Sequence, residues 1–200
     1  MAPATSPTVA VALFDGVEEL DWVGPWEVLT TWAAGWPDDG VSVFTVADHE
    51  GAIRCAKGAR VLADHTWDAV PAFDVLVLPG GRGTLDQLGD DVVRGRLRRA
   101  ADAGVLMASV CTGSLAFADA GLLDGRPATT HWASLDHLAS LGHHIEVRPE
   151  DRFVDDGNVV TAAGVSAGID MALHLVARLH SAERARQVRR YIQYDPDPPV

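Results

Sequence analysis

The chain has 200 residues, of which 48% are hydrophobic and 22% charged, so it can form one globular domain with a sizeable core. Its formal net charge of −12 argues against a nucleic-acid-binding surface. Two cysteines are too few for a disulfide framework, and the sequence shows neither a secretory signal peptide nor an apolar run of membrane-spanning length, so we expect a soluble cytoplasmic protein.

Strand and helix signals alternate along the chain after a loose leader at residues 1–7, and one α/β domain is expected over residues 8–200. Pro25 suits the first turn of a helix that Gly24 opens, and Asp156-Gly157 is typical of a hairpin turn. The alternation predicts a three-layer α/β/α sandwich around a mostly parallel sheet. In chain order, the expected elements are 8–14 (strand), 24–32 (helix), 41–46 (strand), 51–63 (β-hairpin), 73–78 (strand), 90–103 (helix), 104–110 (strand), 114–120 (helix), 128–131 (extended), 133–141 (helix), 144–147 and 153–162 (strands), and 164–179 and 182–192 (helices).

Cys111 lies at the sharp turn between the buried strand 104–110 and the apolar helix 114–120. A thiol at this place faces the unpaired N–H groups of the new helix and the positive end of its dipole, which favours the reactive thiolate. The small neighbours Thr112 and Gly113 leave room for a substrate. The pattern therefore predicts a nucleophilic cysteine, with a buried structural cysteine as the alternative.

Two further segments end predicted strands at the same edge of the sheet, where sites of open α/β folds lie. These are residues 15–21 and 79–83. Gly80 and Gly81 in the second segment can turn their backbone N–H groups toward an anion or oxyanion, although an ordinary turn would need the same residues.

The second half of segment 15–21 carries an acidic cluster of Glu18, Glu19 and Asp21. For Glu18 and Glu19, capping of the following helix and contact with solvent are the expected roles. Asp21 differs because it lies between Leu20 and Trp22, an apolar setting that keeps a carboxyl group partly protonated. Asp21 could then exchange a proton with Cys111.

Thr112 and His131 are the remaining polar side chains expected near the sulfur. The hydroxyl of Thr112 could cap the following helix, or it could hold a substrate or a water molecule. His131 could form a dyad with Cys111 or position the helix that follows it. No His-x-x-x-His or Cys-x-x-Cys spacing occurs, so no metal site is predicted.

Taken together, these motifs resemble the ThiJ/PfpI superfamily, which implies a class I glutamine amidotransferase-like, flavodoxin-like fold with a nucleophile elbow at Cys111. The resemblance covers essentially the whole chain after the leader. Within the superfamily it is nearest to enzymes that hydrate isocyanides, because Thr112 follows the cysteine and the acidic residue is Asp21. Members of the peptidase or glyoxalase type typically have histidine at the position of Thr112, or glutamate at the position of Asp21. The matching segments are 20–21, 25, 28–29, 79–81, 109–114, 128–132, 156–158, 167–170 and 194–199.

The resemblance implies conversion of a small isocyanide to an N-substituted formamide without metal or organic cofactor. Cys111 would attack the isocyanide carbon to give a thioimidate, and Asp21 would supply the proton and later help to activate water. The residues implied to position the substrate or to wall its pocket are Thr112, Gly80, Gly81, Trp22, Trp132 and Ile169; for the last three, core packing is the alternative.

Other functions stay open at this point. One is a glyoxalase- or amidase-type hydrolase that uses the same cysteine, and another is a non-catalytic binding or redox-sensing protein in which Cys111 is oxidised. The resemblance also extends to the sensor domain of AraC-type regulators, but the chain ends at Val200 without room for a helix-turn-helix domain. Neither a nucleic-acid partner nor a membrane partner is expected.

We also expect a homodimer with the active site close to the interface, which the resemblance implies. Residues 16–36 carry more large apolar side chains than one short helix needs for its own core. In a monomer these side chains would instead cover one edge of the sheet. They are Val17, Leu20, Trp22, Val23, Trp26, Trp32 and Trp36.

Overall fold

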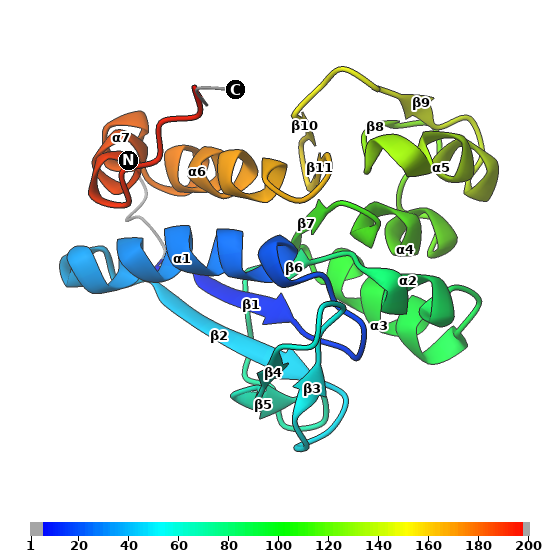
Figure 1. The fold of residues 1–200 in the computed structure, drawn as a ribbon, viewed down its shortest axis with the longest axis horizontal. Coiled ribbons are helices and arrows are strands. Elements are labelled where there is room, and N and C mark those ends of the chain that lie inside the picture. Colours follow the sequence, from blue (N-terminus) through cyan, green and yellow to red (C-terminus); the bar gives the residue numbers. More distant parts are fainter. Residues whose placement is uncertain (1–5, 198–200) are drawn as a thin grey trace.

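The computed structural model of the protein describes residues 6–197, and a seven-stranded sheet forms its centre (Figure 1). The strands lie in the order β10-β11-β7-β6-β1-β2-β5, and every neighbouring pair is parallel except β10 and β11. The predicted mostly parallel sheet is thus confirmed. The strand bounds are β1 Thr8–Ala12, β2 Ser42–Ala47, β5 His65–Thr66, β6 Val75–Leu78, β7 Leu106–Val110, β10 Phe153–Asp156 and β11 Val159–Ala162.

Helices cover both faces of the sheet (Figure 1) because successive side chains of each buried strand point to opposite sides. In β1, Val9 and Val11 pack with the helices of one face, whereas Ala10 and Ala12 pack with those of the other. The first face carries α1 (Glu19–Gly35), α6 (Ala167–Leu179) and α7 (Ala182–Tyr191), and the second carries α2 (Arg82–Gln87), α3 (Asp91–Asp102), α4 (Gly113–Asp119) and α5 (Leu135–Leu141).

Short elements connect the layers. The predicted hairpin within 51–63 is the antiparallel pair of β3 and β4, and a second small sheet pairs β8 with β9 in parallel. Strand β5 and helix α2 were not expected from the sequence. The bounds of the remaining elements are β3 Ile53–Arg54, β4 Arg60–Val61, β8 Pro127–Ala128, β9 Glu146–Val147, and two 3-10 turns at Pro37–Asp39 and Trp132–Ser134.

The prediction that Pro25 lies in the first turn of a helix is wrong, because α1 begins at Glu19 and runs through Pro25. Proline lacks an N–H, so the carbonyl of Asp21, four residues earlier, receives no helical hydrogen bond from it. Close packing against α6 stabilises the helix here. A Cβ atom on Gly168 of α6 would lie 3.3 Å from Cδ of Pro25, and one on Gly24 would lie 3.0 Å from Cγ1 of Ile169.

At the start of the chain, residues 1–5 of the predicted leader lie outside the described residues. Pro7 already belongs to the fold, because it is buried and its carbonyl accepts a hydrogen bond of 3.1 Å from the N–H of Ser42. Within the described part, no helix combines the length and the apolar character that crossing a bilayer requires.

Asp39 joins α1 to α7 through a nearly buried carboxylate. It accepts hydrogen bonds from Nε1 of Trp32 at 2.7 Å and from Nε and Nη2 of Arg184 at 2.6 and 3.0 Å. Burial by itself raises the pKa of Asp39, but the hydrogen bonds from Arg184 and Trp32 outweigh it and lower the pKa. A lowered carboxyl pKa stabilises the fold above the ordinary Asp range, and this stabilisation disappears as the pH falls through the folded-state pKa.

We therefore expect Asp39→Asn to lower the free energy of unfolding at pH 7 by about 2 kcal/mol, since it removes the charge from a nearly buried pair. Urea denaturation followed by circular dichroism measures this loss. The difference from wild type should shrink as the pH falls below 4. Asp38→Asn is the matched control, because Asp38 is the exposed neighbour in the same turn; equal losses in both variants would contradict the role of Asp39.

Candidate active site

Cys111 forms the elbow between β7 and α4, with a φ of +57° that a side-chain-bearing residue rarely adopts. Its N–H donates to the carbonyls of Ala162 and Ala163, both at 3.1 Å. Its own carbonyl accepts from Oγ1 of Thr130 at 2.9 Å and from Oγ of Ser114 at 3.1 Å. Hydrogen bonds on both sides of the residue thus hold the strained turn that the sequence predicted at this place.

The glycines after β6 bring the acidic segment and the elbow together. The N–H of Gly80 donates to Oδ2 of Asp21 at 3.0 Å. A Cβ atom on Gly80 would lie 2.5 Å from both N and Oγ1 of Thr112, so only glycine allows this approach. Gly81, at a φ of +131°, donates its N–H to Oγ1 of Thr112 at 2.9 Å.

Two expectations from the sequence change as a result. The N–H groups of Gly80 and Gly81 bind Asp21 and Thr112, so the prediction that they turn toward a substrate anion is wrong for this structure. Thr112 stands at the N-cap position of α4, yet among the described residues its hydroxyl does not cap that helix. It joins the glycine turn instead, with Oγ1 also 3.3 Å from the carbonyl oxygen of Gly81.

Asp21 is fully buried in the first turn of α1, and it lies close enough to the thiol of Cys111 for each group to shift the pKa of the other. Burial raises the pKa of Asp21 from 3.8 to about 6, although the bonds from Gly80 and Cys111 act in the opposite direction. Within residues 6–197, its Oδ1 atom has no hydrogen-bond partner. The expectation of a carboxyl group that is partly protonated near neutral pH is confirmed in direction.

The expected thiolate at Cys111 is not supported by the structure. Burial, and next the Asp21 carboxylate, raise the pKa of the thiol to about 12, while the N–H groups of Thr112 and Val165 act in the opposite direction. The helix start was expected to dominate, but burial and a neighbouring carboxylate outweigh it. Of the two neighbouring groups, the Asp21 carboxyl group therefore gives up its proton more readily, and near neutral pH the sulfur of Cys111 keeps its own.

Val165 is the residue at the sulfur that the sequence analysis missed. It lies in the segment 163–166 between β11 and α6, and its φ of +47° is unusual for a β-branched residue. Its N–H group lies close enough to the sulfur of Cys111 to lower the pKa of the thiol. The available signal was that β11 is a further strand ending at the same edge of the sheet, with Gly164 directly before Val165.

The two glutamates of the acidic cluster bind the β3–β4 hairpin. Glu18 pairs with Lys57, and Oε1 of Glu19 accepts from the backbone N–H groups of Lys57 at 2.9 Å and Ala59 at 3.3 Å. No described side-chain bond caps α1 at Glu18, so the capping expected there is wrong. Both side chains instead fix the start of α1 beside the hairpin.

His131 takes the positioning role that was one of its two expected functions. Its Nδ1 atom accepts from the N–H of Ala133 at 3.3 Å and so caps the 3-10 turn before α5. Its ring also packs against Gly164, where a Cβ atom would lie 2.4 Å from Cδ2 of the histidine. His131 therefore borders the segment that carries Val165.

The three expected pocket-wall residues lie in different surroundings. Trp22 packs against both halves of the core, and Ile169 packs against Gly24. Trp132 is 77% exposed, with its ring tilted over His131. Core packing thus describes Trp22 and Ile169, and the structure brings together Cys111, Asp21, Thr112, Gly80 and Gly81 from the predicted set.

The comparisons with known proteins agree with this arrangement. A model of the DJ-1/PfpI family matches residues 7–178, which include the elbow, Asp21 and the glycine turn. The chain belongs to the DJ-1/PfpI family. The mostly parallel α/β fold of the chain is consistent with this membership.

Individual relatives in the DJ-1/PfpI family differ in function. The isonitrile hydratase of Pseudomonas putida is 37% identical over 96% of this chain and 80% of its own. The HTH-type transcriptional regulator CdhR of Pseudomonas aeruginosa is 34% identical over 69% of this chain but only 40% of its own. A crystal structure of a ThiJ/PfpI family protein from Pseudomonas syringae has a TM-score of 0.87 at 32% identity and covers 98% of this chain and 78% of that one.

Proposed function

We propose that the protein is an isonitrile hydratase, which adds water to R–N≡C and releases the formamide R–NH–CHO. The observation that carries the proposal is that the Gly80–Gly81 turn joins the buried Asp21 carboxyl group to the Cys111 elbow, where each of the two side chains shifts the pKa of the other. Such a pair combines a nucleophile with a group that can receive and return one proton. The similarity to the Pseudomonas putida enzyme supports the same chemistry.

In the first half of the reaction, the sulfur of Cys111 attacks the terminal carbon of the isocyanide. Asp21, ionised above its pKa of about 6, takes the thiol proton during the attack and delivers it to that carbon. The S–H bond breaks while the C–S and C–H bonds form, which gives the thioimidate R–N=CH–S–Cys. Because the carboxylate removes the proton as the bond forms, the thiol can react without first becoming a free thiolate.

In the second half, Asp21 removes a proton from a water molecule that attacks the thioimidate carbon, and it returns a proton to the nitrogen. The C–S bond of the resulting adduct then breaks, the formamide leaves, and the sulfur recovers its proton. Thr112 is suited to hold this water. Its Oγ1 atom accepts a hydrogen bond from the N–H of Gly81. The described acceptors for its own hydroxyl hydrogen are farther away, with the carbonyl oxygen of Gly81 at 3.3 Å and Oγ1 of Thr84 at 3.5 Å.

The test is an assay of the purified protein with an aryl isocyanide, with the formamide identified by NMR and mass spectrometry. We expect turnover of the isocyanide and none of a 2-oxoaldehyde such as methylglyoxal. Turnover of the 2-oxoaldehyde alone would indicate a glyoxalase-type enzyme. Similarity to the regulator CdhR favours a second candidate, ligand binding without reaction, and tight binding of the isocyanide with no formamide would establish it.

We further propose that the enzyme is a homodimer. Most of the apolar side chains in residues 16–36 are used within the chain, but two remain exposed on either side of Asp21: Leu20 at 37% and Val23 at 36%. Light scattering at micromolar concentration should give about twice the 21.3 kDa chain mass. Val23→Glu should lower both association and turnover if this surface meets a partner. A fully active, monodisperse monomer would contradict the proposal.

A further inference from the structure

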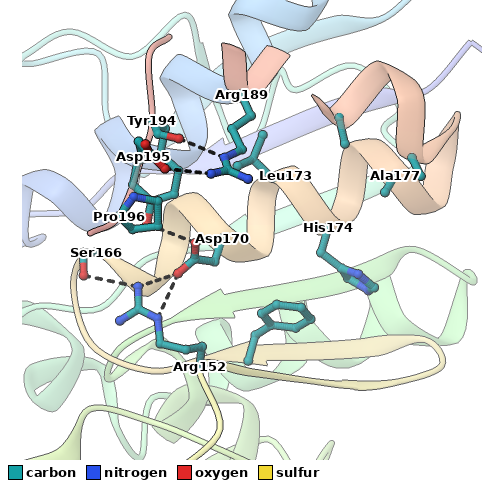
Figure 2. A pocket seen from close by; sticks show the side chains of 13 residues that line it. Arg152, Ser166, Asp170, Leu173, His174, Ala177, Arg189, Tyr194, Asp195 and Pro196 are labelled. Carbon is teal, nitrogen blue, oxygen red and sulfur yellow. Dashed lines mark hydrogen bonds and ion pairs between the residues drawn. The ribbon is translucent and has the colours of Figure 1, made fainter. Parts of the chain in front are cut away.

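An Arg–Asp pair lies at one end of a surface groove of about 1020 Å³ between α6, α7 and the C-terminal segment (Figure 2). The guanidinium of Arg152 contacts Oδ2 of Asp170 through two nitrogens, with Nε at 2.9 Å and Nη2 at 2.5 Å. Nη2 also lies 3.4 Å from Oγ of Ser166. The second oxygen of Asp170 accepts from the hydroxyl of Tyr194 at 3.0 Å, so both carboxylate oxygens are engaged.

These contacts enclose the segment 163–166 that carries Val165. The carbonyl of Arg152 accepts from the N–H of Ala163 at 2.9 Å, at the start of the segment. The side chain of Arg152 reaches Ser166 at its end and Asp170 in the first turn of α6. Arg152 therefore contacts the segment at both of its ends.

Val165 needs such support. A β-branched residue at a φ of +47° is strained, and a strained residue keeps its conformation only where its surroundings fix it. Moreover, the carbonyl of Ala163, two residues before Val165, accepts a hydrogen bond of 3.1 Å from the N–H of Cys111. A movement of this segment would change both the backbone and the sulfur contacts of Cys111.

We propose that Arg152 and Asp170 are positioning residues, whose ion pair holds segment 163–166 in place against the Cys111 elbow, to which the carbonyl of Ala163 is hydrogen-bonded. Neither side chain takes part in the reaction itself. The inference rests on the proposed role of Cys111 as a nucleophile, but not on the identity of the substrate. It assigns a function in the active site to an ion pair whose Arg152 side chain is half exposed to solvent.

The test is the pH profile of Cys111 alkylation by iodoacetamide, measured peptide by peptide with mass spectrometry. In Arg152→Gln and Asp170→Asn we expect alkylation at pH 8 to be about tenfold slower and the profile to move to higher pH, because a hydrogen bond that stabilises the thiolate is loosened. Arg152→Lys should restore part of the rate. With the isocyanide, the same variants should lower kcat more than they change KM.

Arg178→Gln is the matched control. Arg178 lies on the same helix α6 and pairs with Asp155 of β10 at 2.9 Å, so its loss also removes an ion pair between α6 and the β10 region, but away from segment 163–166. If Arg152→Gln and Arg178→Gln have the same thermal midpoint and the same alkylation profile, the inference is overturned. The remaining outcome is an alkylation profile that moves as expected although neither the wild type nor any variant hydrates isocyanides. In that case the inference stands and the proposed function fails.

Discussion

Cys111→Ala is expected to abolish isocyanide hydration, with a loss of about 10⁴-fold or more in kcat, the scale on which covalent enzymes lose activity without their nucleophile. The fold should persist, because alanine keeps the backbone hydrogen bonds that residue 111 makes with Ala162 and Ala163. Circular dichroism and thermal melting verify the fold, and a continuous absorbance assay with an aryl isocyanide measures the rate.

Cys55→Ala provides the matched control for this substitution. Cys55 is the other free cysteine, it is equally buried, and it lies near Trp22 rather than at the elbow. We expect Cys55→Ala to retain most of the wild-type kcat. Mass spectrometry of rapidly quenched wild-type enzyme should find the thioimidate on Cys111. Substantial turnover by Cys111→Ala would rule out covalent catalysis by this residue.

The second large effect is expected for Asp21→Asn, which should lower kcat by about 10²-fold or more, the usual contribution of a positioned acid–base group. Asparagine can still accept the hydrogen bond from Gly80, but it cannot take the thiol proton. For the wild type, kcat/KM should rise with pH around a midpoint near 6, as Asp21 becomes ionised. This midpoint should be absent from the residual activity of Asp21→Asn. An Asp21→Asn enzyme with wild-type kinetics would remove Asp21 from the mechanism.

The same substitution should stabilise the protein at neutral pH. A carboxyl group whose folded pKa is raised from 3.8 to about 6 binds its proton more tightly in the folded state, so stability falls as the pH rises through this interval. Above pH 6, the buried charge of Asp21 lowers the free energy of unfolding by about 3 kcal/mol. Asp21→Asn should therefore raise the free energy of unfolding at pH 8 by roughly 1–3 kcal/mol, with no gain at pH 4. By contrast, Asp39→Asn should lower the free energy of unfolding at neutral pH.

Much of this architecture could be predicted from local patterns. The runs of β-branched and apolar residues that form β1, β6 and β7 are long enough to identify buried strands, and Gly121 and Gly104 mark where elements end. The elbow at Cys111 follows from one strand and one helix that are close in sequence. Pro25 misled the prediction of α1, because tertiary packing against Gly168 and Ile169 outweighs the lost hydrogen bond.

The electrostatics of the site could not be predicted in the same way. The pKa of Cys111 depends on burial and on Asp21, which lies 90 residues earlier in the chain, whereas the sequence shows only the neighbouring helix start. Val165 was missed because nothing in a valine side chain indicates a positive φ. The partners of Gly80 and Gly81 depend on how closely β6 approaches the elbow, which is a property of the assembled sheet.

The strand order has a consequence for how the protein folds. Asp21 and Gly80 are 59 residues apart in sequence, Gly81 and Thr112 are 31 apart, and the parallel strands between them pair only after long crossovers close. Such non-local contacts raise the contact order, and their loop-closure entropy must be overcome before they stabilise anything. We therefore expect the protein to fold slowly, and a newly synthesised chain to become competent for reaction only after these long-range contacts, and the strand pairs between them, have formed.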